Sequence, residues 1–344
     1  MALGPSAIAD AGPWAAALAP QALEGARQRL ASACAQGHTV VVAGHVSPDG
    51  DALGSALALH LALSAAGART VPTIGQRPLE LEPALTALPG VAGLVPASSL
   101  PPASAVDLLV TVDAASPGRL GTVAELLEAG VETLVLDHHA RSTPFGDITL
   151  VAPGAAATVQ VVTLLLDELA LPLTTEVATA LYVGLVTDTG RFSYAATDSS
   201  VHLLAARLLA AGVDQAAWSQ RLFETRRRDD LRLLGRGLAR AAIVEDVGLV
   251  HTHLTPEDLA AAPGGSTEEL IDLLRSAEGT EVALTLRPGD PGTWRASLRS
   301  RGVVDVGAVA AALGGGGHQL AAGFDGAGSV AEVVDRVVGL LREA

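Results

Sequence analysis

Hydrophobic positions along the first two thirds of the chain fall into short, nearly continuous runs and into longer runs with helical spacing. Four short runs rich in Val, Leu and Ile are typical of strands buried on both faces; they cover residues 40–43, 69–74, 106–113 and 131–139. The longer runs predict helices at residues 54–66, 123–128, 157–170 and 175–192. This alternation predicts an α/β fold with a mainly parallel sheet of five or more strands and helices on both faces.

The pattern changes beyond residue 212. Aliphatic residues become sparser and arginines cluster in "WSQRLFETRRRDDLRLLGRGLAR", which predicts a helix that links two domains. The stretches "AAIVEDVGLVHTHL" and "EVALTLRPGDPGTWRASLRS" predict strands, and the second contains a hairpin that turns at "PGDPG". We expect a lead-in over residues 1–20, an α/β domain over 21–212, a linker helix over 213–238 and a smaller α/β domain over 239–344.

Length and composition narrow the class of protein. A chain of 344 residues favours two domains, and a hydrophobic content of 49% excludes wholesale disorder. The lone cysteine, Cys34, excludes an internal disulfide framework and a cysteine-based zinc site. The N-terminus has no basic residue before its apolar stretch, and no uninterrupted apolar run reaches the roughly 18 residues of a membrane span. We therefore expect a cytoplasmic protein with no membrane partner.

The formal net charge of −15 limits the ligands that the protein can bind. Proteins bind long duplex nucleic acid mainly through cationic side chains that meet phosphates, so a strongly acidic chain is a poor candidate for that class. A phosphate-handling protein of this charge should bind small phosphates, which metal ions or a few arginines neutralise locally.

Histidines and aspartates follow the predicted strands at the points where these strands end. They are His45, Asp49 and Asp51 after the first run, Asp113 after the third, Asp137, His138 and His139 at the end of the fourth, and Asp188 in the last helical run. Because the carboxyl ends of parallel strands share one edge of the sheet, we expect these side chains to converge.

Crowded carboxylates repel one another unless a cation lies between them. Carboxylates and neutral imidazoles without thiolates suit harder divalent ions, which favours Mn²⁺, with Mg²⁺ as the alternative. The acids and histidines exceed the needs of one ion and indicate two ions that share a bridging carboxylate. Such a pair activates a water and stabilises the attacking and leaving oxygens at a phosphorus centre.

Each motif also has a purely structural interpretation. Asp113 would cap the next helix, "SPDGD" at residues 47–51 would be only a turn, and "DHH" at residues 137–139 would cap a surface segment. Because so many of these residues are expected at one sheet edge, we favour the metal centre over these alternatives.

Four segments, in this order, resemble the four motifs of the DHH phosphoesterase superfamily: "GHVSPDGDALGSALAL", "VTVDAASPGRLG", "LVLDHHARS" and "LYVGLVTDTGRFSY". Farther on, "SLRSRGVVDVGAVAAALGGGGHQLAAGF" resembles the DHH-associated C-terminal domain, so the resemblance covers residues 39–324. The layout is most similar to the bacterial group of bifunctional oligoribonucleases and 3′-phosphoadenosine-5′-phosphate (pAp) phosphatases. Actinobacterial relatives in this group also act on cyclic di-AMP or its linear product.

The resemblance implies two Mn²⁺ sites joined by one bridging residue. One set of ligands is His45, Asp49 and Asp113, and the other is Asp51, Asp113, His138 and Asp188. Asp137 would orient a histidine, and His139 would face the scissile phosphate, so that Asp113, Asp137 and His139 are the expected catalytic residues. The chain departs from its relatives at Gln160, where they often carry Glu.

A glycine run and nearby arginines are the expected substrate contacts. "GGGGH" at residues 314–318 lacks the Lys-Ser/Thr of a P-loop, and a flexible turn is its plainer interpretation. The resemblance favours phosphate binding, through backbone amides and side chains, by Arg299, Ser300, Arg301, Gly315, Gly316, Gly317 and His318. One of the arginines would alternatively be a solvated strand residue. Four further arginines at helical spacing form either a solvated face or a positive wall: Arg228, Arg232, Arg236 and Arg240.

The sequence therefore predicts a metal-dependent phosphodiesterase. The expected substrates are oligoribonucleotides from dinucleotides to pentanucleotides, cleaved to nucleoside 5′-monophosphates, and pAp, dephosphorylated to AMP. Cyclic di-AMP and pApA are further candidates. The alternatives are a pyrophosphatase or exopolyphosphatase, and a nucleotide-binding regulator that has lost catalysis. The resemblance also implies a homodimer.

Overall fold

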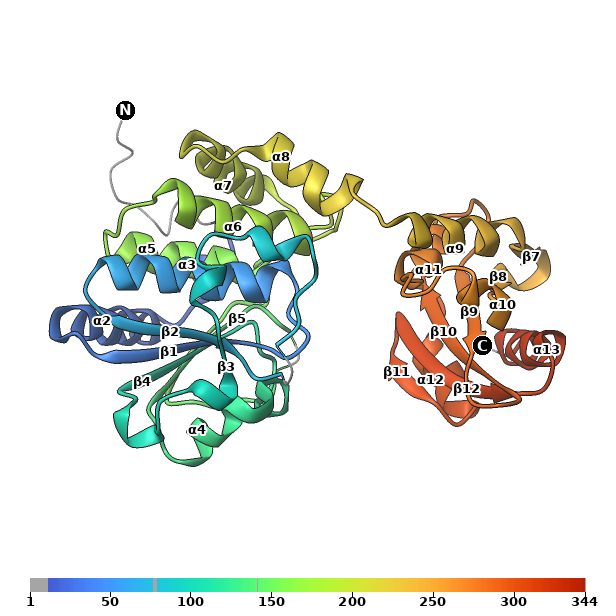
Figure 1. Cartoon of the computed structure of the whole chain (residues 1–344), viewed down its shortest axis with the longest axis horizontal. Helices are drawn as coiled ribbons and strands as arrows, with labels where there is room; N and C mark the ends of the chain where they lie inside the picture. Colours follow the sequence, from blue (N-terminus) through green and yellow to red (C-terminus); the bar gives the residue numbers. More distant parts are fainter. Residues whose placement is uncertain (1–11, 77–78, 141, 344) are drawn as a thin grey trace. The chain divides into compact units, whose positions relative to one another are not determined.

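The computed structural model describes residues 12–76, 79–140 and 142–343. The chain divides into two compact units, Met1–Glu224 and Thr225–Ala344, and each has its own sheet (Figure 1). The boundary lies within residues 213–238, and the prediction of one continuous helix there is wrong. Helix α8 (Gln215–Ser219) continues as a π-helical turn (Gln220–Glu224), and a separate helix, α9 (Arg228–Ala239), follows a break.

Helix α9 is a separate helix from α8 because it has its own N-terminal hydrogen bonds. The carboxylate of Asp230 accepts the backbone N–H of Arg227 at 3.3 Å and that of Ser266 at 2.7 Å. Leu233 and Leu234 of α9 then join a small core with Leu270 of the second unit. The helix is thus part of the second unit and does not act as a free linker.

The first unit contains the predicted parallel sheet, and its α/β fold class is confirmed. Six parallel strands lie in the order β3-β2-β1-β4-β5-β6. They are β1 (Thr39–Gly44), β2 (Arg69–Ile74), β3 (Val95–Pro96), β4 (Leu108–Val112), β5 (Thr133–Asp137) and β6 (Ile148–Val151). The hydrophobic pattern did not reveal β3 and β6, which are short strands at the two edges.

Helices cover both faces of this sheet, as Figure 1 shows. One face carries α2 (Pro20–Gln36), α3 (Gly50–Ala65), α5 (Thr158–Glu168) and α6 (Thr175–Asp188), with α7 (Ser199–Ala210) packed on α6. The other face carries a 3-10 segment (Pro117–Val123) and α4 (Ala124–Glu128). Along β1, Val40 and Val42 face the first layer, and Val41 and Ala43 face the second. Both sides of the strand are therefore apolar, as its continuous run predicted.

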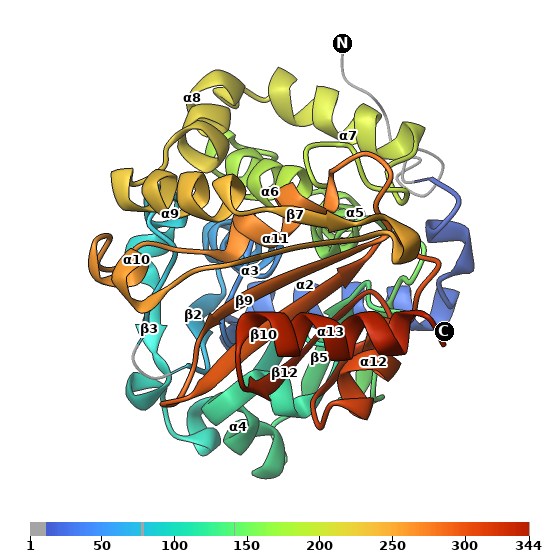
Figure 2. The ribbon, with the colours of Figure 1, turned by 90° about the vertical axis from the view of Figure 1, so that its right-hand side faces the viewer.

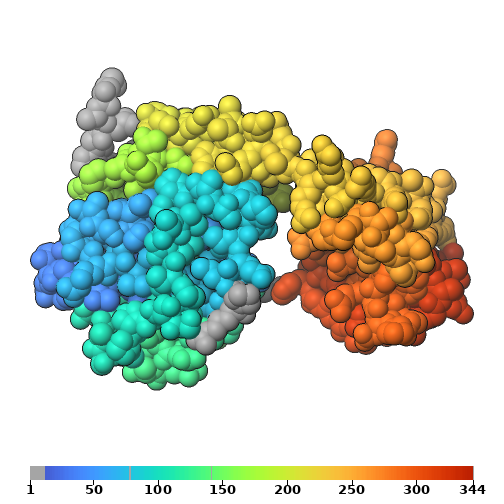
Figure 3. All heavy atoms as spheres, in the orientation of Figure 1, coloured from blue at the N-terminus to red at the C-terminus, as the bar shows by residue number. Residues whose placement is uncertain are grey.

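Between β2 and β4 the chain forms a series of short turns on the surface of the first unit, coloured cyan in Figure 3. These turns are 3-10 segments at Leu85–Ala87, Val91–Gly93, Ala97–Ser99 and Ala103–Ala105. Of the lead-in expected over residues 1–20, residues 1–11 lie outside the described residues. Trp14 and Ala15 are buried in the core of the first unit.

The second unit is a mixed sheet in the order β11-β12-β10-β9-β8-β7, in which only β8 and β9 are parallel. Its strands are β7 (Ala242–Val244), β8 (Leu249–His253), β9 (Val282–Pro288), β10 (Thr293–Ser300), β11 (Gly316–His318) and β12 (Ala321–Ala327). Its remaining helices are α10 (Pro256–Ala260), α11 (Glu268–Arg275), α12 (Val306–Ala312) and α13 (Val330–Leu341). The hairpin expected at "PGDPG" is confirmed, because β9 and β10 pair antiparallel across it.

The two faces of the second sheet pack different helices. α12 and α13 bury Val306, Val309, Val333 and Val337 on one face, and Figure 2 shows α13 lying across the strands. α11 packs on the other face through Ile271 and Leu274. Across the described ranges, no helix has both the length and the apolar character needed to cross a membrane.

Candidate metal centre

The loop after β1 places Asp49 and Asp51 at the start of α3. This helix begins at Gly50, earlier than the predicted start at residue 54, because Oδ1 of Asp49 accepts the backbone N–H groups of Asp51 and Ala52, both at 3.0 Å. Asp51 therefore lies in the first helical turn. The turn interpretation of "SPDGD" explains the hydrogen bonds of Oδ1 of Asp49. It does not explain the position of Oδ2, which lies 3.7 Å from Nε2 of His45.

Asp113 follows the last residue of β4 and has a left-handed backbone with φ of 57°. It does not cap a helix, because the next 3-10 segment begins at Pro117 with Ser116 as its N-cap. The nearly buried carboxylate accepts a hydrogen bond from Oγ1 of Thr158 at 2.9 Å. Its two oxygens face two different histidines, at 3.5 Å from His45 Nε2 and 3.6 Å from His138 Nε2. Asp113 thus lies between the two histidines.

The "DHH" segment begins at the last residue of β5, and among residues 138–140 and 142–147 no helix precedes β6, which argues against the interpretation as a surface cap. Asp137 is fully buried, and its Oδ1 accepts the backbone N–H of His138 at 2.9 Å and lies 2.7 Å from Nδ1 of His139. Nε2 of His138 lies 3.2 Å from Oδ2 of Asp188. The two neighbouring histidines therefore share one partner, because His138 Nε2 and His139 Nδ1 both lie 3.6 Å from Oδ1 of Asp113, and they differ in the other, which is Asp188 or Asp137.

Asp51 and Asp188 come from two helices that pack closely together. A Cβ atom on Gly54 of α3 would lie 2.4 Å from the carbonyl oxygen of Ala180 in α6, so only glycine permits this spacing. The carboxylate of Asp51 is fully buried and accepts the N–H groups of Thr158 at 2.5 Å and Val159 at 3.0 Å in the first turn of α5. Three helices thus fix this carboxylate.

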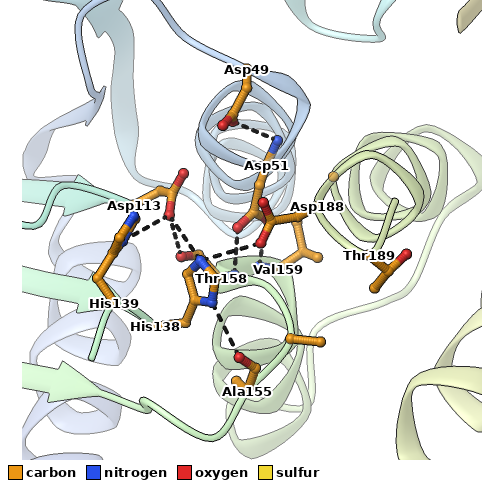
Figure 4. Close-up of polar contacts among 12 residues, drawn as sticks. Asp49, Asp51, Asp113, His138, His139, Ala155, Thr158, Val159, Asp188 and Thr189 are labelled. Carbon is orange, nitrogen blue, oxygen red and sulfur yellow. Dashed lines mark hydrogen bonds and ion pairs between the residues drawn. The ribbon is translucent and has the colours of Figure 1, made fainter. Parts of the chain in front are cut away.

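All six expected metal ligands come together, as Figure 4 shows for most of them. Their ligand atoms form overlapping groups within 4.8 Å, namely His45–Asp49–Asp113, Asp51–His138–Asp188 and Asp113–His138–His139. Asp113 belongs to the first and third groups, and His138 to the second and third. Because neighbouring groups share a residue, the ligand atoms form one continuous cluster that could hold metal ions.

Backbone carbonyl groups orient the two inner histidines. Nδ1 of His45 lies 2.8 Å from the carbonyl oxygen of Val46, and Nδ1 of His138 lies 3.1 Å from that of Ala155. A carbonyl oxygen accepts a proton on Nδ1, which leaves the Nε2 lone pair directed into the centre. No side-chain pattern in the sequence indicates these contacts, because the acceptors are backbone atoms.

Three side chains near the centre were not predicted as site residues, although Gln160 was named as a departure from the relatives. Thr158 supports Asp113, and Gln160 accepts the N–H of Ala156 at 2.7 Å, which holds the turn before α5. Arg119 lies with Nη2 at 2.9 Å from His45 Nδ1. Arg119 lies in the quoted segment "VTVDAASPGRLG", but no spacing rule singled it out.

Three groups of the centre, Asp51, Asp188 and His45, have strongly perturbed pKa values. Burial raises the pKa of Asp51 well above its usual range, and repulsion by Asp113 and Asp188 adds to this. Burial also raises the pKa of Asp188, to about 6, against the opposing effect of His138. Burial lowers the pKa of His45, but the Asp113 and Asp49 carboxylates outweigh it and raise the value to about 10. These shifts express a surplus of negative charge that a cation would neutralise.

The donor set fits a pair of hard divalent cations. It consists of four carboxylates and two imidazoles, without a thiolate, and both imidazoles direct Nε2 toward carboxylates of the cluster. A buried carboxylate such as Asp51, with no arginine among its hydrogen-bond partners in the described ranges, gains most from such a cation.

The expected substrate contacts lie in the second unit. Arg299 of β10 and His318 of β11 are both register partners of Ala321 in β12, so their side chains share one face of the sheet. Arg301 follows β10, and its Nε donates to the carbonyl oxygen of Arg275 at 2.8 Å. Ser300 does not fit the expectation. It is fully buried, and its hydroxyl group donates to Glu281 at 2.9 Å, so the side chain stabilises a turn and does not face a ligand.

The glycine run is not the flexible turn that was its plainer interpretation, because Gly316–His318 form the edge strand β11. A Cβ on Gly315 would lie 2.1 Å from the carbonyl oxygen of Gly323, and one on Gly317 would lie 2.5 Å from Cα of Ala322. Gly316 has no heavy atom within 4 Å of its would-be Cβ. Close strand packing therefore explains Gly315 and Gly317, whereas Gly314 and Gly316 face open space.

The arginines at helical spacing mostly form ion pairs. Arg236 and Arg240 both pair with the nearly buried Asp258, and Arg232 pairs with Asp229. Asp258 therefore neutralises two members of the row, which argues against a continuous positive wall.

Known proteins are similar to this chain in sequence and in fold. Residues 39–185 match the DHH family, N-terminal domain, and residues 256–344 match the DHHA1 domain. The bifunctional oligoribonuclease and PAP phosphatase NrnA of Thermus thermophilus is 37% identical over 311 residues, which cover 88% of this chain and 89% of that protein. The cyclic-di-AMP phosphodiesterase PdeA of Listeria monocytogenes is 29% identical over 317 residues, 85% of this chain and 45% of PdeA.

Among solved structures, an exopolyphosphatase-related protein of Bacteroides fragilis superposes with a TM-score of 0.84 at 23% identity, over 95% of this chain and 97% of that one. Exonuclease RecJ bound to manganese superposes with a TM-score of 0.55 at 20% identity, over 94% of both chains. At identities of 23% and 20%, these two superpositions establish the fold alone. Together with the 37% identity to the Thermus protein, the two matched domains show that this chain belongs to the DHH family of phosphoesterases.

Proposed function

We propose that this protein is a two-metal phosphodiesterase that cleaves short oligoribonucleotides to nucleoside 5′-monophosphates and dephosphorylates pAp to AMP. The observation that carries the proposal is the convergence of two ligand groups on the shared carboxylate of Asp113. The substrate assignment is supported by the Thermus relative, which is named for both activities and aligns over nearly its whole length. The Listeria relative, named a cyclic-di-AMP phosphodiesterase, supports pApA and cyclic di-AMP as further substrates.

Two groups of residues would hold the cations. His45, Asp49 and Asp113 would form one site, and Asp51, Asp113, His138 and Asp188 the other. We propose Mn²⁺, with Mg²⁺ as the alternative. When bound, the cations supply Lewis-acid stabilisation of the charge that develops on the phosphate oxygens.

His139, positioned by Asp137, would donate a proton to the leaving oxygen at the scissile bond. Oδ1 of Asp137 lies 2.7 Å from Nδ1 of His139, and this contact raises the pKa of His139 above its ordinary value. Nε2 of His139 then carries the proton that the leaving oxygen needs. Asp137 positions the ring, as the acid partner of a catalytic histidine commonly does.

The second unit would bind the remainder of the nucleotide. Arg299 and His318 share one sheet face, and Gly316 leaves open space beside them. A guanidinium and an imidazole on one face suit a terminal phosphate. Arg301 would contribute a further positive charge, although its Nε already has a backbone partner. We also propose a cytoplasmic location, and a homodimer remains a prediction for sizing experiments.

A side-by-side activity panel tests the proposed function. Dinucleotides, trinucleotides, pAp, pApA and pyrophosphate are each incubated with the full-length protein and Mn²⁺, Mg²⁺ or chelator. We expect metal-dependent release of mononucleotides from the first two and of AMP from pAp. Hydrolysis of pyrophosphate alone would instead show a pyrophosphatase.

Asp113→Asn provides the internal test of the two-cation scheme. The substitution preserves shape but removes the shared charge, so hydrolysis should fall by more than about 100-fold, the upper end of the loss seen when a supporting residue of a metal site is removed. Glu132→Gln, which alters an exposed ion pair with Arg29, is the control. Unchanged turnover in Asp113→Asn would reject the scheme.

A further inference from the structure

The turn after Asp188 has an unusual backbone. Gly190, Arg191 and Phe192 are consecutive and have φ values of 55°, 60° and 64°. Left-handed conformations are disfavoured for residues with a Cβ, and a run of three is rare. Strain of this kind persists only where the surroundings enforce it, and it clusters at functional sites.

Hydrogen bonds that Thr189 accepts hold this left-handed turn in place. Its buried hydroxyl oxygen accepts the N–H of Phe192 at 3.2 Å, and its carbonyl oxygen accepts the N–H groups of Ser193 at 3.0 Å and Tyr194 at 3.1 Å. The hydroxyl group of Ser193 also donates to the carbonyl oxygen of Gly190. The conformation is therefore fixed by at least four contacts.

Three aromatic or cationic side chains leave this turn, and two of them are held by neighbours within the first unit. The guanidinium of Arg191 lies 4.9 Å from the centroid of the Phe223 ring, and the Phe192 ring lies 5.2 Å from the ring of His202. The third, Tyr194, is 55% exposed and is the only aromatic among the exposed large hydrophobic side chains of the described residues.

The Tyr194 ring lies directly over Gly190. A Cβ at Gly190 would come within 2.4 Å of two ring carbons, so the absence of a side chain there allows the ring to lie against the backbone. Gly190 is two residues beyond Asp188, one of the grouped metal-ligand candidates. The strained turn thus holds an exposed, flat aromatic surface in the segment that directly follows Asp188.

We propose that Tyr194 is a nucleobase-binding platform, on which one base of the substrate stacks while its phosphate lies at the metal centre. The inference rests on the proposed function and specifies how that site selects nucleotides. Bases of any identity stack on aromatic rings, so the platform contributes affinity without strong sequence preference. It gives the site a preference for nucleotides over phosphate compounds that lack a base.

The test measures binding of pApA, and of the same compound with both bases removed, by titration calorimetry of the full-length protein in Ca²⁺. Tyr194→Ala should lower the ratio of the two affinities by about tenfold, within the range measured when a stacking aromatic is removed. Tyr194→Phe keeps the ring and should keep the ratio. Leu203→Ala, which removes another exposed apolar side chain of the same unit, is the matched control.

The outcomes separate the two hypotheses. If the wild-type protein binds pApA better than the abasic compound and Tyr194→Ala removes this preference, the platform stands, even if pApA is not cleaved in Mn²⁺ and the proposed function fails. If Tyr194→Ala keeps the preference, or the wild type has none, the platform is rejected. Unchanged melting temperatures would show that each variant is folded.

Discussion

At the scale of single residues, the centre depends on side chains that perform two tasks with different atoms. Oδ1 of Asp49 caps helix α3 while Oδ2 faces His45, and each oxygen of Asp113 faces a different histidine. The sequence identified these residues because histidine and aspartate at strand ends are conspicuous. It did not identify Thr158 or the carbonyl groups of Val46 and Ala155, because their contribution depends on contacts between distant segments.

Thr158→Val should weaken the centre without removing a ligand. The hydroxyl group donates to Oδ1 of Asp113, and loss of such a supporting bond typically costs 10–100-fold in metal affinity or activity, so we expect about a tenfold higher Mn²⁺ dissociation constant. Calorimetric titration of Mn²⁺ measures it. Thr163→Val removes a similar hydroxyl that donates to a helix carbonyl, and it should leave the affinity unchanged.

The perturbed pKa values predict how pH affects the metal-free protein. Asp188 has a pKa raised from 3.8 to about 6, so its protonation favours the folded state; this contribution is full below pH of about 4 and is lost as the pH rises through 6. For His45 the pKa rises from 6.5 to about 10, so its contribution is full below pH of about 6.5 and is lost as the pH rises through 10.

Mn²⁺ should oppose this loss, because it binds the deprotonated ligands. Scanning calorimetry should therefore show a larger Mn²⁺-induced rise in melting temperature at pH of about 8 than at about 5. An equal rise at both values would contradict the pKa shifts. A control scan with chelator that is already saturated with Mn²⁺ shows how much of the rise in melting temperature depends on free Mn²⁺.

At the scale of elements, close helix contacts set the geometry of the centre. α3 and α6 approach each other at Gly54 and Gly184, and a Cβ on Gly184 would lie 3.1 Å from the Asp51 carboxylate. The hydrophobic runs predicted both helices, but the start of α3 was placed too late because the capping role of Asp49 was not recognised. The break before α9 was missed for a similar reason, since Asp230 starts a new helix inside an arginine-rich run.

Gly54→Ala should disturb both stability and activity. The added methyl group meets the Ala180 carbonyl at 2.4 Å and forces α3 and α6 apart, at a cost of about 1–3 kcal/mol in the free energy of unfolding. Activity should fall as well, because Asp51 and Asp188 separate. Urea denaturation gives the stability change, and metal-dependent hydrolysis gives the activity.

Gly25→Ala is the matched control for this experiment. Gly25 lies within helix α2 and has no heavy atom within 4 Å of its would-be Cβ. Alanine there should stabilise the protein by about 0.5–1 kcal/mol and leave activity unchanged. A destabilised Gly25→Ala together with a neutral Gly54→Ala would contradict the packing argument.

At the scale of the whole molecule, the two units have separate sheets and separate cores. Periodicity in the sequence predicted the parallel sheet of the first unit well, since its strands are continuous apolar runs. It predicted the second unit less well: "GGGGH" reads as a loop, and the strand β11 forms only because β12 lies beside it. Pairing between segments that are distant or glycine-rich leaves little trace in local hydrophobicity.

Arg299→Ala should affect substrate binding without affecting the cations. Since Arg299 belongs to the second sheet, Mn²⁺ affinity should stay at the wild-type value, while KM for pApA rises about tenfold through loss of a charged hydrogen bond. Steady-state kinetics and Mn²⁺ titration measure the two quantities. Arg336→Ala, on helix α13, serves as the control; a parallel change in both quantities would refute the separation of roles.

The proposed metal ligands span the chain from His45 to Asp188, and the last of them stands at the end of α6. A nascent chain on the ribosome therefore holds an incomplete set until almost the whole first unit has been synthesised. We expect the cations to be captured late, after α6 has packed on α3, so that truncated translation products would scavenge little metal from the cell.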